Sequence, residues 1–272
     1  MLRDITIGQY FPGKSVIHKL DPRMKIVLTM AYIVELFIAS NPIGLLVGIG
    51  FLILAYGISK IPPFMILKSL KPVVPIIIFT SVLNMFFIEG DVLLQLWKIQ
   101  ITMQGVTTAI VMSVRIICLI AGTSLLTYTT SPIALTDGIE RLFAPLKRFN
   151  LPVHELAMMM TIALRFIPTL IEETDKIMSA QKARGADLET GGLMQRARAL
   201  IPILIPLFVS AFRRADELAL AMECRCYRGG EGRTRMKQLK IKPRDIYCAI
   251  FVGACVAGVI AINLFAPVIL PM

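Results

Sequence analysis

Two arginines are placed where they could contact another protein. Arg184 and Arg225 each lie near the expected end of a long helical pattern and between small residues. Small neighbours let a backbone approach a partner closely, and a planar, permanently charged guanidinium suits a carboxylate-lined pocket at an interface. Spacing alone leaves docking and a simple solvated charge as equal alternatives. The two triplets are Ala183-Arg184-Gly185 and Cys224-Arg225-Cys226.

A second run with chemical meaning extends from Gly8 to Ser15, whose letters GQYFPGKS match the phosphate-binding loop of nucleotide hydrolases. Such a loop follows a buried strand and opens a packed helix, so that its amides and lysine surround the phosphates. Here Pro22 follows soon after, and the next apolar run is a membrane span. We therefore expect no nucleotide binding, and any nucleotide hydrolysis should belong to a separate subunit.

Other catalytic or metal-binding patterns are not evident. Of the five cysteines, three lie in apolar runs, where a thiol behaves as a small hydrophobic group. Cys224 and Cys226 have no second cysteine or histidine pair nearby, since the two histidines are His18 and His154. The sequence predicts no cofactor, no metal, no disulfide framework and no enzymatic activity in this chain.

The composition is that of a protein with several membrane spans. Hydrophobic residues make up 56% of the chain and the formal net charge is +11, and the mean hydropathy is +0.73. In a membrane protein, excess positive charge usually belongs to cytoplasmic loops beside anionic lipid. We therefore expect a lipid bilayer as partner and no nucleic acid.

Five apolar stretches are long enough to be transmembrane helices. Their approximate ranges are 25–39, 43–58, 72–88, 103–129 and 246–269. Two more apolar runs are excluded as spans: 151–170 contains His154, Glu155 and Arg165, and 199–212 offers too few uncharged residues. The fold class is an all-α membrane protein with about five transmembrane helices and a long cytoplasmic arm of amphipathic helices.

Loop charges orient the chain. Basic residues precede the first span, follow the second and fill the segment after the fourth, which places the N-terminus in the cytoplasm. Three regions result: residues 1–130 form a membrane domain with four spans, 131–245 the cytoplasmic amphipathic arm, and 246–272 the fifth span and outer tail.

Two charges and three methionines inside apolar segments need an explanation. Glu35 and Arg115 lie at similar depths in their spans, so we favour a structural ion pair over a proton or ion relay. Met158, Met159 and Met160 are explained by ordinary packing or by an adaptable surface for exchangeable partners, and we favour the surface.

Several motifs together resemble one family, the transmembrane T component of energy-coupling factor transporters, over nearly the whole chain. At the second arginine triplet that family commonly has Ala-Arg-Gly, so the flanking cysteines leave the backbone approach there in question. The motifs are Leu20-Asp21-Pro22-Arg23-Met24-Lys25, Thr129-Thr130-Ser131-Pro132, Ala183-Arg184-Gly185 and the run from Pro206 to Tyr227. Asp21 and Pro22 also predict a helix N-cap followed by proline at the first helical position.

The resemblance implies an energy-coupling subunit in the plasma membrane of a prokaryote. Its partners would be two cytosolic ATPases, which bind ATP and Mg, and a small membrane substrate-binding S component. The arginine triplets would dock one to each ATPase. The substrate would be a micronutrient, with vitamins as the first choice and cobalt or nickel as the second.

The alternative function is a self-sufficient secondary carrier or channel, against which stand the odd number of spans and the cytoplasmic arm. A membrane-bound enzyme is a third class, and no carboxylate, histidine or metal-ligand constellation favours it.

Overall fold

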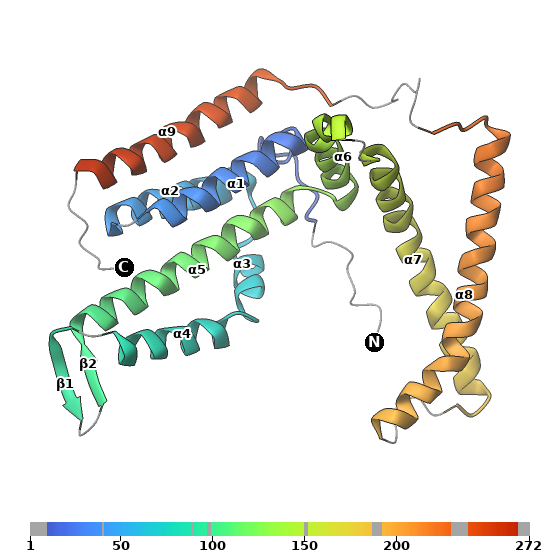
Figure 1. The fold of residues 1–272 in the computed structure, drawn as a ribbon, viewed down its shortest axis with the longest axis horizontal. Helices are drawn as coiled ribbons and strands as arrows, with labels where there is room; N and C mark the ends of the chain where they lie inside the picture. Colours follow the sequence, from blue (N-terminus) through green and yellow to red (C-terminus); the bar gives the residue numbers. More distant parts are fainter. Residues whose placement is uncertain are drawn as a thin grey trace. The chain divides into compact units, whose positions relative to one another are not determined.

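The structure is a computed structural model that describes residues 10–39, 41–88, 90–96, 99–149, 152–186, 192–229 and 239–265. The described chain is helical, as the sequence predicts, with one short β-hairpin in addition (Figure 1). It divides into two compact units. The membrane unit lies within residues 8–138 and 239–272, and the described part of the arm unit lies within residues 139–229.

Six helices and the hairpin belong to the membrane unit. A further helix, α6 (Pro132–Phe143), begins in this unit and ends in the arm. The six helices are α1 (Pro22–Ile38), α2 (Pro42–Ser59), α3 (Pro63–Leu70), α4 (Val74–Phe87), α5 (Met103–Thr129) and α9 (Pro243–Phe265), and the strands are β1 (Val92–Leu96) and β2 (Ile99–Thr102).

The described helices provide four to five candidate spans, in agreement with the expected number. By length and composition α2, α5, α7 (Val153–Ala183) and α9 qualify, and α3 with α4 makes a fifth if this pair, bent by 62°, is one span. The set differs from the expected one. α1 has 17 residues, a length of about 25 Å, slightly short of the hydrocarbon thickness.

The exclusion of 151–170 as a span is not supported by this criterion. α7 contains an 18-residue window of mean hydropathy 1.3 with no more than two charged residues, of which only 6% is buried. This window contains His154, Glu155 and Arg165, and it remains apolar on average because the many leucine, isoleucine and methionine residues around them outweigh their polarity.

The expected span 72–88 corresponds to α4 alone, and proline explains the bend between α3 and α4. Pro72 lies between α3 and α4, and its ring and missing N–H do not permit an unbroken helix. The chain therefore ends α3 at Leu70 and restarts α4 at Val74.

α1 and α9 lie side by side and run in the same direction. The amide N–H of Asp21 donates to Asp245 at one end, and the side chain of Asn263 donates to the carbonyl of Ile38 at the other. The two bonded residues are 224 positions apart in sequence at one end and 225 at the other, so α9 follows α1 in the same direction along its length. Both helices therefore enter the membrane from the same side.

α1 and α5 are antiparallel. Lys25 near the start of α1 donates to the carbonyl of Thr129 at the end of α5, and Arg115 donates to the carbonyl of Ala39 just after α1. Between these ends, a Cβ on Gly122 would lie 2.5 Å from the ring of Tyr32. Glycine at this position lets α5 approach the buried tyrosine.

Candidate functional site

Arg184 occupies the C-cap of α7, within a regular helix-ending motif. The N–H of Ala186 donates to the carbonyl of Gln181 at 3.0 Å, and the N–H of Gly185 donates to that of Lys182 at 3.0 Å. This pair of bonds is the Schellman motif, which requires a left-handed residue after the cap. Gly185 supplies it with φ of 87°. The Arg184 side chain is exposed.

Arg225 occupies the same position at the end of α8 (Leu193–Cys224). The N–H of Tyr227 donates to the carbonyl of Met222 at 3.0 Å, and the N–H of Cys226 donates to that of Glu223 at 2.8 Å. The helix ends at Cys224 because Cys226 adopts the left-handed conformation, with φ of 55°.

The two arginines therefore have equivalent backbone settings. Each is the cap residue of a Schellman motif, and each side chain is exposed. Cys226 adopts the conformation that Gly185 adopts at the first triplet, although a residue with a Cβ is strained there. The backbone at Cys226 therefore follows the same path as the backbone at Gly185.

α7 and α8 cross within the arm unit (Figure 1). At the crossing, Glu173 of α7 accepts a hydrogen bond from the Ser210 hydroxyl and a charged one from Arg214 at 2.9 Å. We call Glu173, Ser210 and Arg214 the crossing clamp. It ties two helices whose ends carry the exposed arginines.

A second contact at the crossing follows from proline chemistry. Pro206 has no N–H, so the carbonyl of Pro202, one turn earlier, lacks its normal helical partner. The side-chain amide of Gln181 donates to this carbonyl at 3.2 Å. The prolines inside α8 thus leave a carbonyl free to accept a hydrogen bond from a side chain of α7.

The arm unit exposes many large apolar side chains. Met159 and Met160 are 55% and 54% exposed, and Met158 is half-buried, so the three methionines do not form a closed core. Exposed apolar residues of this density indicate a contact surface. Its other members include Leu156, Leu200, Ile201, Leu204, Ile205, Phe208, Val209, Phe212 and Leu220.

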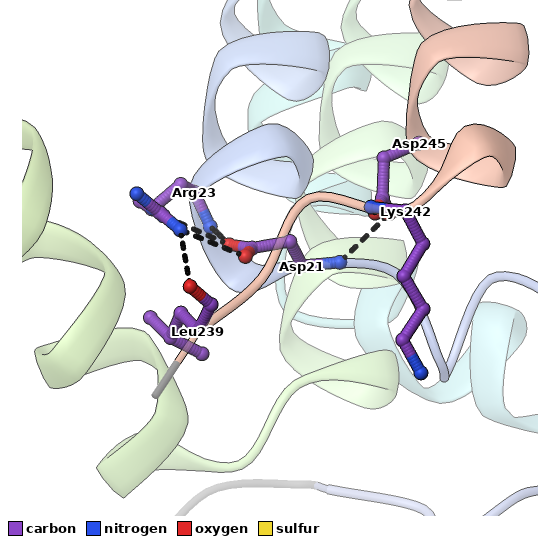
Figure 2. A network of polar contacts seen from close by, with 5 residues as sticks. All are labelled: Asp21, Arg23, Leu239, Lys242 and Asp245. Atoms are coloured by element: carbon purple, nitrogen blue, oxygen red, sulfur yellow. Dashed lines mark hydrogen bonds and ion pairs between the residues drawn. The ribbon is translucent and has the colours of Figure 1, made fainter. Parts of the chain in front are cut away.

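The Asp21 motif begins α1 as predicted, and it also joins α1 to α9 (Figure 2). The Asp21 carboxylate accepts the N–H of Arg23 at 2.9 Å, which is the expected N-cap bond. Asp245, which is 1% exposed, accepts from the N–H of Asp21 at 3.0 Å and from that of Lys242 at 2.6 Å. Arg23 also bridges Asp21 to the carbonyl of Leu239.

Lys25 extends the same junction to α5. Its ammonium donates to the carbonyls of His18 and Thr129 and to the Thr130 hydroxyl, at 3.2, 2.8 and 3.2 Å. Sequence reasoning gave Asp21 only a capping role and gave Lys25 none. The sequence offered one clue, since the motif that contains Lys25 and the motif Thr129-Thr130 both belong to the family resemblance. That the two motifs touch depends on tertiary packing, which the sequence pattern does not reveal.

The expected ion pair between Glu35 and Arg115 is not formed. Arg115 donates to the carbonyl of Ala39 at 2.6 Å, and neither carboxylate oxygen of the buried Glu35 has a hydrogen-bond partner among the described residues. The similar depth of the two charges correctly placed Arg115 near the end of α1. It did not determine which acceptor the guanidinium binds, since the unsatisfied carbonyl at the helix end competes with the Glu35 carboxylate.

The described part of the GQYFPGKS run, from Tyr10 onwards, contains no strand and opens no helix. Instead, His18 binds the Ser15 hydroxyl at 2.8 Å and the carbonyl of Phe11 at 3.0 Å. Partial burial lowers the pKa of His18, and the bond to Phe11 opposes this shift. The described residues also contain no group of three or more histidine, cysteine or acidic side chains able to hold a metal.

Comparisons with known proteins agree over most of the chain. The CbiQ family, described as cobalt transport protein, matches residues 13–236. The energy-coupling factor transporter transmembrane protein EcfT of Thermosediminibacter oceani is 56% identical over 257 residues, covering 94% of this chain and 97% of that protein. EcfT of Ruminiclostridium cellulolyticum is 56% identical over 90% of this chain and 92% of its own length. EcfT of Listeria innocua is 44% identical over 96% and 98%, respectively.

Proposed function

Because this chain belongs to the EcfT transmembrane proteins of energy-coupling factor transporters, in the CbiQ family, we propose that Arg184 and Arg225 are its docking points for two ATPase subunits. The chain is the energy-coupling, non-catalytic, multi-pass membrane subunit of such a transporter. Each arginine docks one ATPase, and these two residues are called the docking arginines below. The ATPases bind ATP and Mg, and this chain binds neither.

The observation that supports this proposal best is the equivalence of the two helix ends. An arginine at the cap of a Schellman motif projects from the end of a rigid helix, with a left-handed residue directly after it. Two such ends in one arm, on helices joined by the crossing clamp, suit a contact with two related subunits. A guanidinium can then bind a carboxylate through two parallel hydrogen bonds in each.

Transmission follows from this arrangement. When ATP binding closes the two ATPases, the ends of α7 and α8 are drawn together, and the clamp at Glu173 carries the movement along both helices. The exposed apolar surface of the arm, with Met158, Met159 and Met160, receives the S component and forces it to reorient. Methionine side chains adapt to different partners, which suits a subunit that serves several S components.

The proposed placement has the start of α1 and the arm on the cytoplasmic side of a prokaryotic cell membrane. Residues 1–130 then form the membrane domain, 131–245 the coupling arm, and 246–272 the last span and outer tail. The parallel alignment of α1 and α9 supports this, because both helices must begin on one side. The basic residues before α1 favour the cytoplasm for that side.

The transported substrate is a micronutrient selected by the S component. Vitamins are our first choice, on the resemblance to transporters with a shared T component. The name of the CbiQ family, cobalt transport protein, keeps cobalt or nickel as the second. Co-purification from native membranes, followed by identification of the small membrane protein bound to this chain, distinguishes the two.

Arginine replacement tests the docking proposal. We expect R184A and R225A each to weaken co-purification of the ATPases, and the double variant to abolish both co-purification and ATP-driven uptake. Loss of a hot-spot arginine costs about 2–4 kcal/mol of binding. The matched control is R213A, an exposed arginine in the middle of α8, which should leave the complex intact. Isolation of the full complex from the double variant would refute the proposal.

A further inference from the structure

A cavity of about 370 Å³ lies within the membrane unit. Side chains of α1, α2, α5 and α9 line it, among them Leu28, Phe51, Leu125 and Phe251. An apolar protein cavity of about 150 Å³ is already sufficient to bind benzene. The cavity is therefore large enough for a flexible hydrocarbon.

Four of the polar side chains that line this cavity are already hydrogen-bonded. Three donors of Lys25 have three acceptors, so that only its methylene stem remains for contact with an occupant. Thr29 and Thr129 each donate to a carbonyl one turn earlier in their own helix, and Tyr32 donates to the carbonyl of Gly48. A polar ligand would find few partners, which makes the occupant apolar.

The surroundings of the cavity supply both hydrocarbon and positive charge. Three lining residues, Leu54, Ile58 and Tyr247, are 48%, 43% and 72% exposed on the membrane unit, so the cavity borders on the lipid-facing surface. Lys19, next to the lining residue Leu20, and Lys242, before α9, have exposed side chains. Figure 2 shows the Lys242 side chain directed away from the Asp21 junction.

From this geometry we infer that the cavity binds one acyl chain of an anionic glycerophospholipid, with the headgroup phosphate beside Lys19 and Lys242. Acyl chains are the apolar molecules always present around a transmembrane unit, and anionic headgroups are attracted by surface lysines. The bound lipid packs between α1, α2, α5 and α9 and closes a void that would otherwise lack packing contacts.

Native mass spectrometry of the full chain tests the inference. The protein is released from nanodiscs containing equal amounts of phosphatidylglycerol and phosphatidylcholine. We expect one phosphatidylglycerol to remain bound to the wild type. C248F fills part of the cavity and should lower this occupancy at least about tenfold, equivalent to about 1.4 kcal/mol. The matched control I250F changes an exposed residue of the same helix outside the cavity and should retain the lipid.

A second measurement covers the case in which C248F fails to fold. Phosphatidylglycerol with a diazirine on its acyl chain is photo-crosslinked to the wild type, and the labelled peptides are sequenced. We expect labelling of residues 51–58 and 247–252, and removal of both charges in K19Q/K242Q should abolish the preference for phosphatidylglycerol. Labelling spread evenly over exposed apolar residues such as Phe79 and Phe87, or equal lipid retention by C248F and I250F, would overturn the inference.

Discussion

At the scale of single residues, Cys226 shows how a helix ending is maintained without glycine. Its backbone has a φ of 55°, in the left-handed region that glycine occupies at no steric cost. The two hydrogen bonds of the Schellman motif, from Cys226 and Tyr227, offset part of this strain. The exposed Arg225 therefore lies on a backbone that has the Schellman geometry but is strained at Cys226.

Replacing this cysteine by glycine should stabilise the end of α8. We expect C226G to relieve about 0.5–1 kcal/mol of local strain, because glycine has no Cβ to crowd the left-handed conformation. Slower amide hydrogen exchange in residues 222–227 would measure the effect. C224G is the matched control: Cys224 is the last helical residue, and glycine there should speed exchange. Faster exchange in C226G would contradict the strain argument.

Asp245 is the residue on which the junction between α1 and α9 depends most. It is almost fully buried, and its two carboxylate oxygens accept from the amides of Asp21 and Lys242. A buried donor left without an acceptor costs about 1–3 kcal/mol.

We therefore expect D245N to lower the stability of the membrane unit by a similar amount, since its amide group presents one oxygen where two are needed. The apparent melting temperature of the purified chain in detergent measures this loss. D216N replaces an exposed aspartate of the arm and should have almost no effect. Equal melting temperatures for the two variants would show that the junction contributes little.

At the scale of secondary-structure elements, the crossing of α7 and α8 connects the two docking arginines. Glu173 accepts hydrogen bonds from Ser210 and Arg214. Gln181 donates to the Pro202 carbonyl, whose helical partner is missing because Pro206 has no N–H. The crossing thus has specific polar contacts, which fix the register of the two helices more strictly than apolar packing does. A displacement of one helix end should therefore be transmitted to the other helix.

Weakening the crossing clamp should separate docking from transport. We expect E173Q to retain both ATPases and yet to reduce ATP-driven uptake about 3- to 10-fold, because the ion pair with Arg214 becomes a weaker hydrogen bond from the guanidinium to an uncharged amide oxygen. Uptake by proteoliposomes with the complete complex provides the measurement. E172Q changes the exposed neighbouring glutamate and serves as control. Loss of the ATPases from E173Q would assign the residue to assembly instead.

At the scale of the whole molecule, features with local causes were predictable from the sequence. Asp21 caps α1 and Pro22 is its first residue, each at its expected position. The helical pattern placed both arginines near helix ends, which the structure confirms, and only the family resemblance linked them to ATPases.

Features that depend on tertiary contacts were not predictable in this way. Arg115 binds a backbone carbonyl and leaves Glu35 without a partner, and Lys25 joins α1 to α5 over 104 positions of sequence. The β-hairpin of residues 92–102 was also missed, because its apolar strands are short and lack a recognisable two-residue turn signal.

The distance between the two docking ends, measured inside the complete transporter, tests the central claim most directly. Spin labels on keto amino acids at Ala180 and Ala221, both exposed, leave the cysteines and docking arginines unchanged. Pulsed electron–electron double resonance then compares the nucleotide-free complex with the complex trapped by ATP and vanadate. We predict a shorter distance between the labels in the trapped state. An unchanged distance in a preparation that transports its substrate would contradict the proposed coupling.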